Sequence, residues 1–140
     1  MAIVTLSQVR TALVARVSTL PDLLQVHATV PDKIVPPCAV IQPAPGDFLM
    51  FSPTMGSDVV NYLMVVSIYV PAPVGTAADA QEALDPYLAP EGDYSVTAVL
   101  NGTLGGLVSS ASCLFARNYR AETWDEGRYV AADFPVQVMT

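Results

Sequence analysis

The chain has 140 residues, 52% of them hydrophobic, and a formal net charge of −7. Its 13 acidic side chains outnumber 6 scattered basic ones, which disfavours binding to nucleic-acid phosphates. Histidine and lysine each occur once, as His27 and Lys33, so the chain is poor in bases for an enzyme. The apolar excess indicates instead a protein that covers part of its surface with a partner.

The sequence is expected to form a single domain over residues 1–140, because no linker-like stretch divides it. The first residues lack the basic start and apolar core of a signal peptide. Asn61, Ser67 and Pro71 interrupt the most hydrophobic stretch, so no membrane span is predicted. A soluble protein made in the cytoplasm is expected.

The first predicted elements are a helix and two strands. Thr5 followed by Gln8 matches a capping box, and apolar residues at helical spacing extend the predicted helix over Thr5–Leu20. Strands are expected over Leu24–Val30 and Cys38–Ile41, and the prolines between them keep the connection outside the sheet.

A long β-hairpin is predicted over Asp47–Val70. On its return strand, alternate residues from Val60 to Val70 form an apolar face, and the opposite face is mixed. A run of large apolar residues, 48–51, also precedes the loop of this hairpin. A strand turns only alternate side chains toward one core, so half of this run needs another cover. The alternatives are a sheet buried on both faces and a contact with a neighbouring subunit. The candidate interface residues are Phe48, Leu49, Met50 and Phe51 on the arm, and Leu63, Val65 and Tyr69 on the mixed face.

Short helices are expected next. Thr76 can cap a helix with alanines and Leu84 on one side and acidic residues on the other. Asp85-Pro86 is expected to begin a separate turn, because proline breaks a regular helix. Ser95 opens a further helical turn, Val96–Leu100, that ends at an Asn-Gly pair.

The rest of the chain alternates as strands. One strand is predicted through Cys113–Tyr119, a polar turn over Glu122–Gly127 and a last strand over Tyr129–Val138. Pro135 cannot donate a ladder hydrogen bond, so the last strand is expected at a sheet edge or with a bulge. The order predicts an α+β fold: a mostly antiparallel sheet with a long β-hairpin, an N-terminal helix and one or two further helices packed on it.

Residues that could carry a reaction are few. His27 lies within a predicted strand and is interpreted as a polar strand position, since one histidine without clustered ligands does not form a typical zinc site. Cys38 and Cys113 have apolar or small neighbours and are expected to be buried free thiols, with a disulfide as the alternative. The acidic groups are interpreted as solvated surface. We therefore predict no enzyme, no catalytic residue, no cofactor and no metal.

A series of short motifs along nearly the whole chain resembles the tail terminator proteins of long-tailed bacteriophages of the siphophage type, above all those from phages of actinobacteria. Each motif is short, and their order carries the resemblance. In chain order they are Leu20-Pro21-Asp22-Leu23, Val30-Pro31-Asp32, Pro36-Pro37-Cys38-Ala39-Val40, residues 80–88, Ser95-Val96, Thr103-Leu104-Gly105-Gly106 and the strand from Tyr129 to Val138.

The resemblance implies a structural virion protein. Such proteins form a homohexameric ring that caps the tail tube, ends tail polymerisation and provides the surface for head–tail joining. The implied partners are further copies of the chain, the tail tube protein and head–tail connector proteins, at the head-proximal end of the virion tail. DNA would pass through the lumen without specific binding, which suits an acidic chain. The resemblance also implies an α+β fold with a sheet lined by helices, and no catalytic residues.

Two alternatives stay open. A head–tail connector or stopper, or another minor tail protein, shares much of this arrangement. A small-ligand-binding module belongs to a different class and would need a pocket with convergent polar groups. The oligomeric state in solution is the first measurement that separates them.

Overall fold

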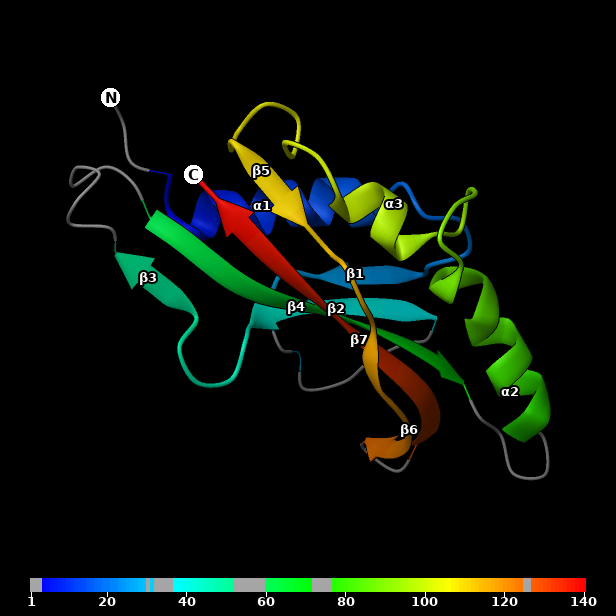
Figure 1. The fold of residues 1–140 in the computed structure, drawn as a ribbon. Coiled ribbons are helices and arrows are strands. Elements are labelled where there is room, and N and C mark those ends of the chain that lie inside the picture. Colours follow the sequence, from blue (N-terminus) through cyan, green and yellow to red (C-terminus); the bar gives the residue numbers. More distant parts are fainter. Residues whose placement is uncertain (1–3, 30, 32–36, 52–59, 72–76, 125–126) are drawn as a thin grey trace.

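In the computed structural model, the described residues form a seven-stranded sheet with helices over one of its faces (Figure 1). The structure describes residues 4–29, 31, 37–51, 60–71, 77–124 and 127–140. The helices are α1 (Leu6–Val17), α2 (Ala77–Leu84), the 3-10 helix η1 (Asp85–Leu88) and α3 (Val96–Leu100). The strands are β1 (Gln25–His27), β2 (Cys38–Pro43), β3 (Leu49–Phe51), β4 (Val60–Pro71), β5 (Ser110–Ser112), β6 (Arg117–Trp124) and β7 (Gly127–Met139).

Two long strands, β4 and β7, form the centre of the sheet. They pair antiparallel from Asn61↔Met139 to Pro71↔Tyr129. The outer edge of β4 is shared by β2 and β3, and the outer edge of β7 is shared by β5 and β6. Among the described strand pairs, β1 with β2 is the parallel one. The predicted α+β fold with a mostly antiparallel sheet is therefore confirmed, including the hairpin of β3 and β4.

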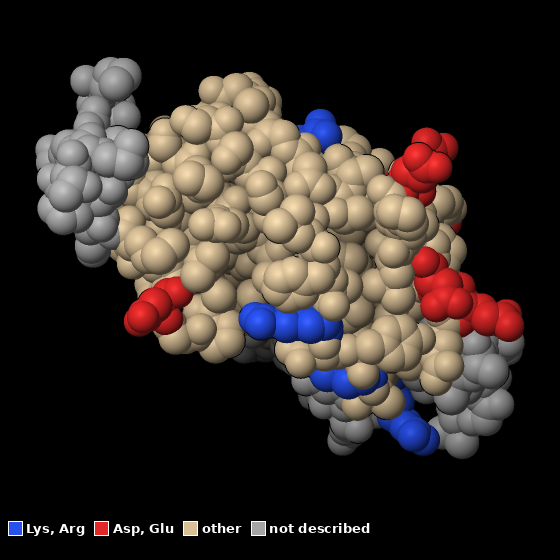
Figure 2. All heavy atoms as spheres, viewed as in Figure 1, with Lys and Arg blue, Asp and Glu red and all other residues tan. Residues whose placement is uncertain are grey.

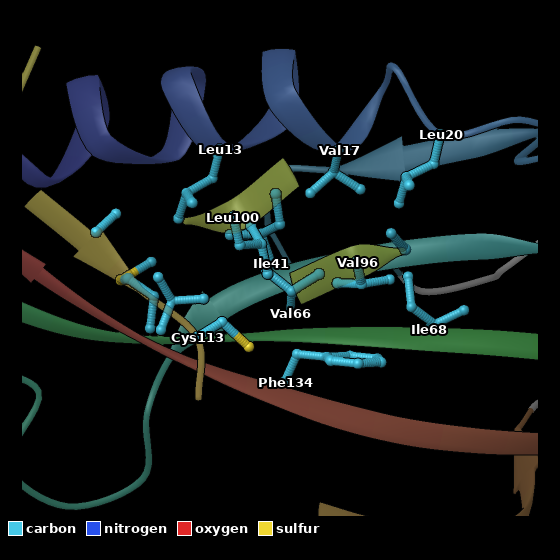
Figure 3. Close-up of a cluster of buried hydrophobic side chains, with 14 of the residues drawn as sticks. Leu13, Val17, Leu20, Ile41, Val66, Ile68, Val96, Leu100, Cys113 and Phe134 are labelled. Atoms are coloured by element: carbon cyan, nitrogen blue, oxygen red, sulfur yellow. The ribbon is translucent and has the colours of Figure 1, made fainter. Parts of the chain in front are cut away.

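The core lies between the helices and one face of the sheet, which we call the helix-covered face (Figure 3). Thr5 caps α1 through the predicted capping box with Gln8. Leu13 and Val17 point from α1 toward Ile41, Val66, Ile68 and Phe134 on the strands, as Figure 3 shows. The alternate residues of β4 from Val60 to Val70 all belong to this core, so the apolar face predicted for that strand is confirmed.

The two short helical elements also follow the prediction. The Ser95 side chain accepts a hydrogen bond from the Ala98 backbone N–H and so caps α3. Pro86 stands in the first turn of η1, where the missing N–H costs nothing. Thr76 lies outside the described residues, so the proposed cap of α2 is not seen. The first helix ends at Val17 rather than Leu20, because a tight turn over Ser18–Leu20 precedes Pro21.

Three predictions about the strands are wrong. The strand expected over Cys113–Tyr119 is interrupted, because the backbone of Cys113 bonds to Asn101 and Thr97 near α3 instead of to a strand. The polar turn expected over Glu122–Gly127 is narrower, since β6 continues to Trp124. The last strand is not at an edge.

Pro135 nevertheless has a place that suits it. It pairs with Val65 of β4 on one side. On the other side, β6 pairs with β7 as far as Asp133 and β5 pairs with it from Gln137 onward, so no described strand pairs with the stretch between them. The bulge lies in β6, between Arg117 and Arg120, and not in β7 itself.

Candidate subunit interface

The second face of the sheet carries the mixed side of β4, and none of the described helices packs against it. Part of this face is nevertheless buried. Cys38, Val40, Tyr69 and Ala131 form a small second core, and the rings of Tyr69 and Tyr129 meet edge to face with their centroids 6.4 Å apart. The chain itself therefore buries the centre of this face.

A partly buried polar network lies on the same face as this second core. The Asp133 carboxylate accepts hydrogen bonds from Ser67 Oγ at 2.6 Å, Asn118 Nδ2 at 3.0 Å and Arg120 at 3.0 Å. Burial alone would raise the pKa of Asp133, but these hydrogen bonds and the Arg120 charge outweigh burial and lower it. The Arg120 guanidinium also lies over the Tyr69 ring, 5.8 Å from its centroid. The network joins β4, β6 and β7 across the sheet.

The predicted interface residues of β4 differ in exposure. Val65 and Tyr69 are buried, with exposed fractions of 3% and 5%, so they have little surface left for a partner. Leu63 is only half-buried. The cover that the sequence predicted for this face thus comes from the chain itself at two positions and is incomplete at the third.

The arm predicted around residues 48–51 pairs with β4 as expected. Leu49 lies opposite Tyr62, and the Leu63 N–H donates to the Phe48 carbonyl at 2.7 Å. Phe48 and Leu49 are partly buried, and Met50 is exposed. The backbone of Phe51 pairs with Val60, but its side chain and the following loop lie outside the described residues.

An apolar shelf that sequence reasoning missed lies beside Leu63. Leu114 and Phe115, between β5 and β6, are 85% and 56% exposed. With Ala44, Leu63 and Pro135 they line a pocket of about 230 Å³ on the second face. We call these five residues the apolar ledge. The signal was present, because Leu114 and Phe115 are adjacent apolar residues and a strand buries only one of two neighbours against one core.

The other candidate residues have ordinary surroundings. His27 Nε2 lies 2.9 Å from the Gln25 side-chain oxygen, as expected for a polar strand position. Cys38 and Cys113 are buried free thiols, which confirms that interpretation, and burial raises the pKa of Cys38 to about 11. Within the described ranges, no cluster of side chains suits a metal ion, and no helix is long and apolar enough to cross a membrane.

Neither a protein-family model nor a curated protein matches this chain. The geometry therefore has to carry the functional argument together with the sequence motifs. What it offers is a sheet face that its own chain covers only in part, next to an exposed apolar ledge.

Proposed function

We propose that this chain is a tail terminator protein: a structural subunit that forms a homo-oligomeric ring on the end of a phage tail tube, stops tube polymerisation and provides the head–tail joining surface. The observation that carries the proposal is the order of short motifs from Leu20 to Val138. The α+β fold, with helices on one face of a sheet, is the fold that this resemblance implies.

The proposed mechanism is geometric. A ring forms when one surface of each copy contacts a different surface of the next and the rotation closes. Within the described side chains, residues 48–50 of the arm and the half-buried Leu63 supply apolar surface for such contacts. One rim of the ring matches the last ring of tail tube protein and offers no site for another, which ends the tube. No reaction is involved, in keeping with the scarcity of histidine and lysine.

The lumen of such a ring must let DNA pass. A net charge of −7 disfavours retention of phosphates on the wall, because like charges repel. Replacing acidic residues that face the lumen with lysine is expected to slow DNA ejection. Unchanged ejection kinetics would count against this part of the proposal.

The decisive test is electron microscopy of particles made by a phage whose copy of this gene is interrupted. Overlong tails are expected if the chain ends polymerisation. Free tails of normal length would instead indicate the connector or stopper, and normal infectious particles would overturn both virion roles. Complementation with the intact gene controls for effects on neighbouring genes.

A further inference from the structure

The apolar ledge is held firmly although two of its side chains face water. The Asn101 side-chain oxygen accepts from the Cys113 N–H at 2.9 Å, and Thr97 Oγ1 donates to the Cys113 carbonyl at 2.6 Å. These bonds from α3 fix the chain just before Leu114 and Phe115. The exposure of both side chains is thus built into the fold, and a fixed exposed pair of large apolar residues is typical of a contact surface.

The ledge is continuous with the arm. The Leu63 carbonyl accepts from the Ala44 N–H at 2.9 Å, and the Leu63 N–H donates to Phe48. Leu63 therefore belongs to both surfaces. A partner that packs on the ledge also reaches the edge of the arm.

A basic side chain borders the apolar ledge, because Arg117 lines the same pocket. The Arg117 guanidinium lies 6.0 Å from the centroid of the Phe115 ring, and it makes no ion pair within the part of the chain that the structure describes. Figure 2 shows three groups of basic side-chain atoms in a row along the lower middle of the molecule and a further group at its upper edge. A partner for this surface should therefore carry negative charge around an apolar centre.

Such a surface exists on the chain itself. A hollow of about 300 Å³ is lined by Asp22, Ala83, Pro86, Tyr87 and Tyr94, together with Pro37 and Val70. A cavity of about 150 Å³ already accommodates a benzene ring, so the hollow has room for a phenyl side chain. We call it the acidic hollow.

Asp22 lines this hollow, and further acidic side chains lie on the elements that line it or on the loop that follows them. Glu82 and Asp85 are exposed on α2 and η1, and Glu91 and Asp93 are exposed on the loop that follows. In Figure 2 most of the Asp and Glu atoms gather on the right-hand side, where Figure 1 places α2 and that loop. The apolar ledge and the acidic hollow share no lining residue, so they are two separate surfaces.

We infer that the apolar ledge of one copy docks into the acidic hollow of the next copy, with Phe115 at the centre and Arg117 facing the acidic rim. The inference rests on the proposed ring and names its subunit contact. Apolar burial supplies affinity, and the opposite charges set the orientation. Because the two surfaces differ, the contact is head-to-tail and can repeat around a ring.

The test uses two full-length variants that each block one surface. Phe115→Glu places a negative charge on the apolar ledge. Ala83→Arg fills the acidic hollow and places a positive charge in it. Each alone is expected to reduce the mass measured by light scattering to that of one chain, 14.8 kDa. Mixed in equal amounts, they should form a dimer of twice that mass and nothing larger, because one intact ledge then meets one intact hollow.

A matched control places the same charge elsewhere. Ala15→Glu lies on the exposed side of α1 and should assemble like the unmodified chain. Circular dichroism of every variant checks that the fold is kept. A Phe115→Glu variant that still forms rings, or a mixture that stays monomeric, overturns the docking contact alone. An unmodified chain that is monomeric at every concentration overturns the contact and the proposed ring together. If the unmodified chain retains DNA and the Arg117→Glu variant does not, Arg117 binds phosphate rather than a second copy of the chain.

Discussion

Arg120 and Asp133 form an ion pair across the β6–β7 hairpin, with the guanidinium nitrogen 3.0 Å from the carboxylate oxygen. Both side chains lie on the second face of the sheet, and their contacts extend to Ser67 and Tyr69 of β4. The pair thus ties the outer strand β6 to the centre of the sheet. Removing the pair should therefore lower the free energy of unfolding.

Asp133→Asn should lower the free energy of unfolding at pH 7 by about 1.5–3 kcal/mol, the usual worth of hydrogen bonds to a charged group. The folded pKa of Asp133 is below its ordinary value of 3.8. Its contribution is therefore complete above pH 3.8 and disappears as the pH falls through the folded pKa. Urea unfolding at pH 7 and at pH 3 should show the difference between variant and unmodified chain shrinking in acid. Asp47→Asn, at an exposed acid, is the control, and an equal effect there would contradict the assignment.

Leu13→Ala should destabilise the fold by about 2–5 kcal/mol, because it leaves a cavity between α1 and the sheet. Leu13 is fully buried, whereas Leu24 is 64% exposed. Leu24→Ala is chemically the same change and should cost less than about 0.5 kcal/mol. Thermal or urea unfolding of both variants measures the contrast. Similar losses at the two positions would place Leu13 outside the core.

The two thiols should react slowly with a disulfide reagent at pH 8 in the native protein and rapidly in urea. Both are buried, and burial raises the pKa of each, to about 11 for Cys38, so that little of the reactive thiolate forms. The reaction is followed by absorbance, with Cys38→Ser and Cys113→Ser used to assign each phase. Immediate reaction of a thiol in the native state would be incompatible with its burial.

Deleting the arm and its loop, Phe48 to Asp58, should yield monomers by light scattering if the arm carries part of the subunit contact. Circular dichroism must show that the remaining sheet persists. Met50→Ser is a milder change at the exposed position of the arm and should weaken assembly without affecting the fold. If rings stay intact after the deletion, the arm is not part of the subunit contact. The apolar ledge is then the remaining candidate, and the Phe115→Glu variant tests it.

Local patterns were sufficient for elements whose determinants are close in sequence. The capping box of Thr5 and Gln8, the Ser95 cap and the alternation along β4 each depend on residues a few positions apart. The interruption after β5 was missed because it depends on Asn101 bonding to Cys113, a contact that apolar alternation does not register. The parallel pairing of β1 with β2 was also missed, because apolar alternation does not register the direction in which two strands pair.

The candidate interface was predicted in part. The apolar run at residues 48–51 marked the arm, but hydropathy could not tell that Val65 and Tyr69 are covered by their own chain. Tyr69 is covered by residues distant in sequence, such as Ala131 and Tyr129. The ledge at Leu114 and Phe115 fell within a stretch interpreted as an ordinary strand. Only the fold shows that neither side chain reaches the core.

The pairing of β4 with β7 also has a kinetic consequence. The central ladder joins the two halves of the chain, and among the described strands β7 is the partner of both β5 and β6. Folding must bring β4 and β7 together, and so close the long stretch of chain between them, before most of the sheet can form. Such pairing of distant segments favours slow, cooperative folding. A chain cut in the turn between α3 and β5 would leave two fragments with bare strand edges. Each fragment would aggregate alone and recover its structure only when mixed with the other.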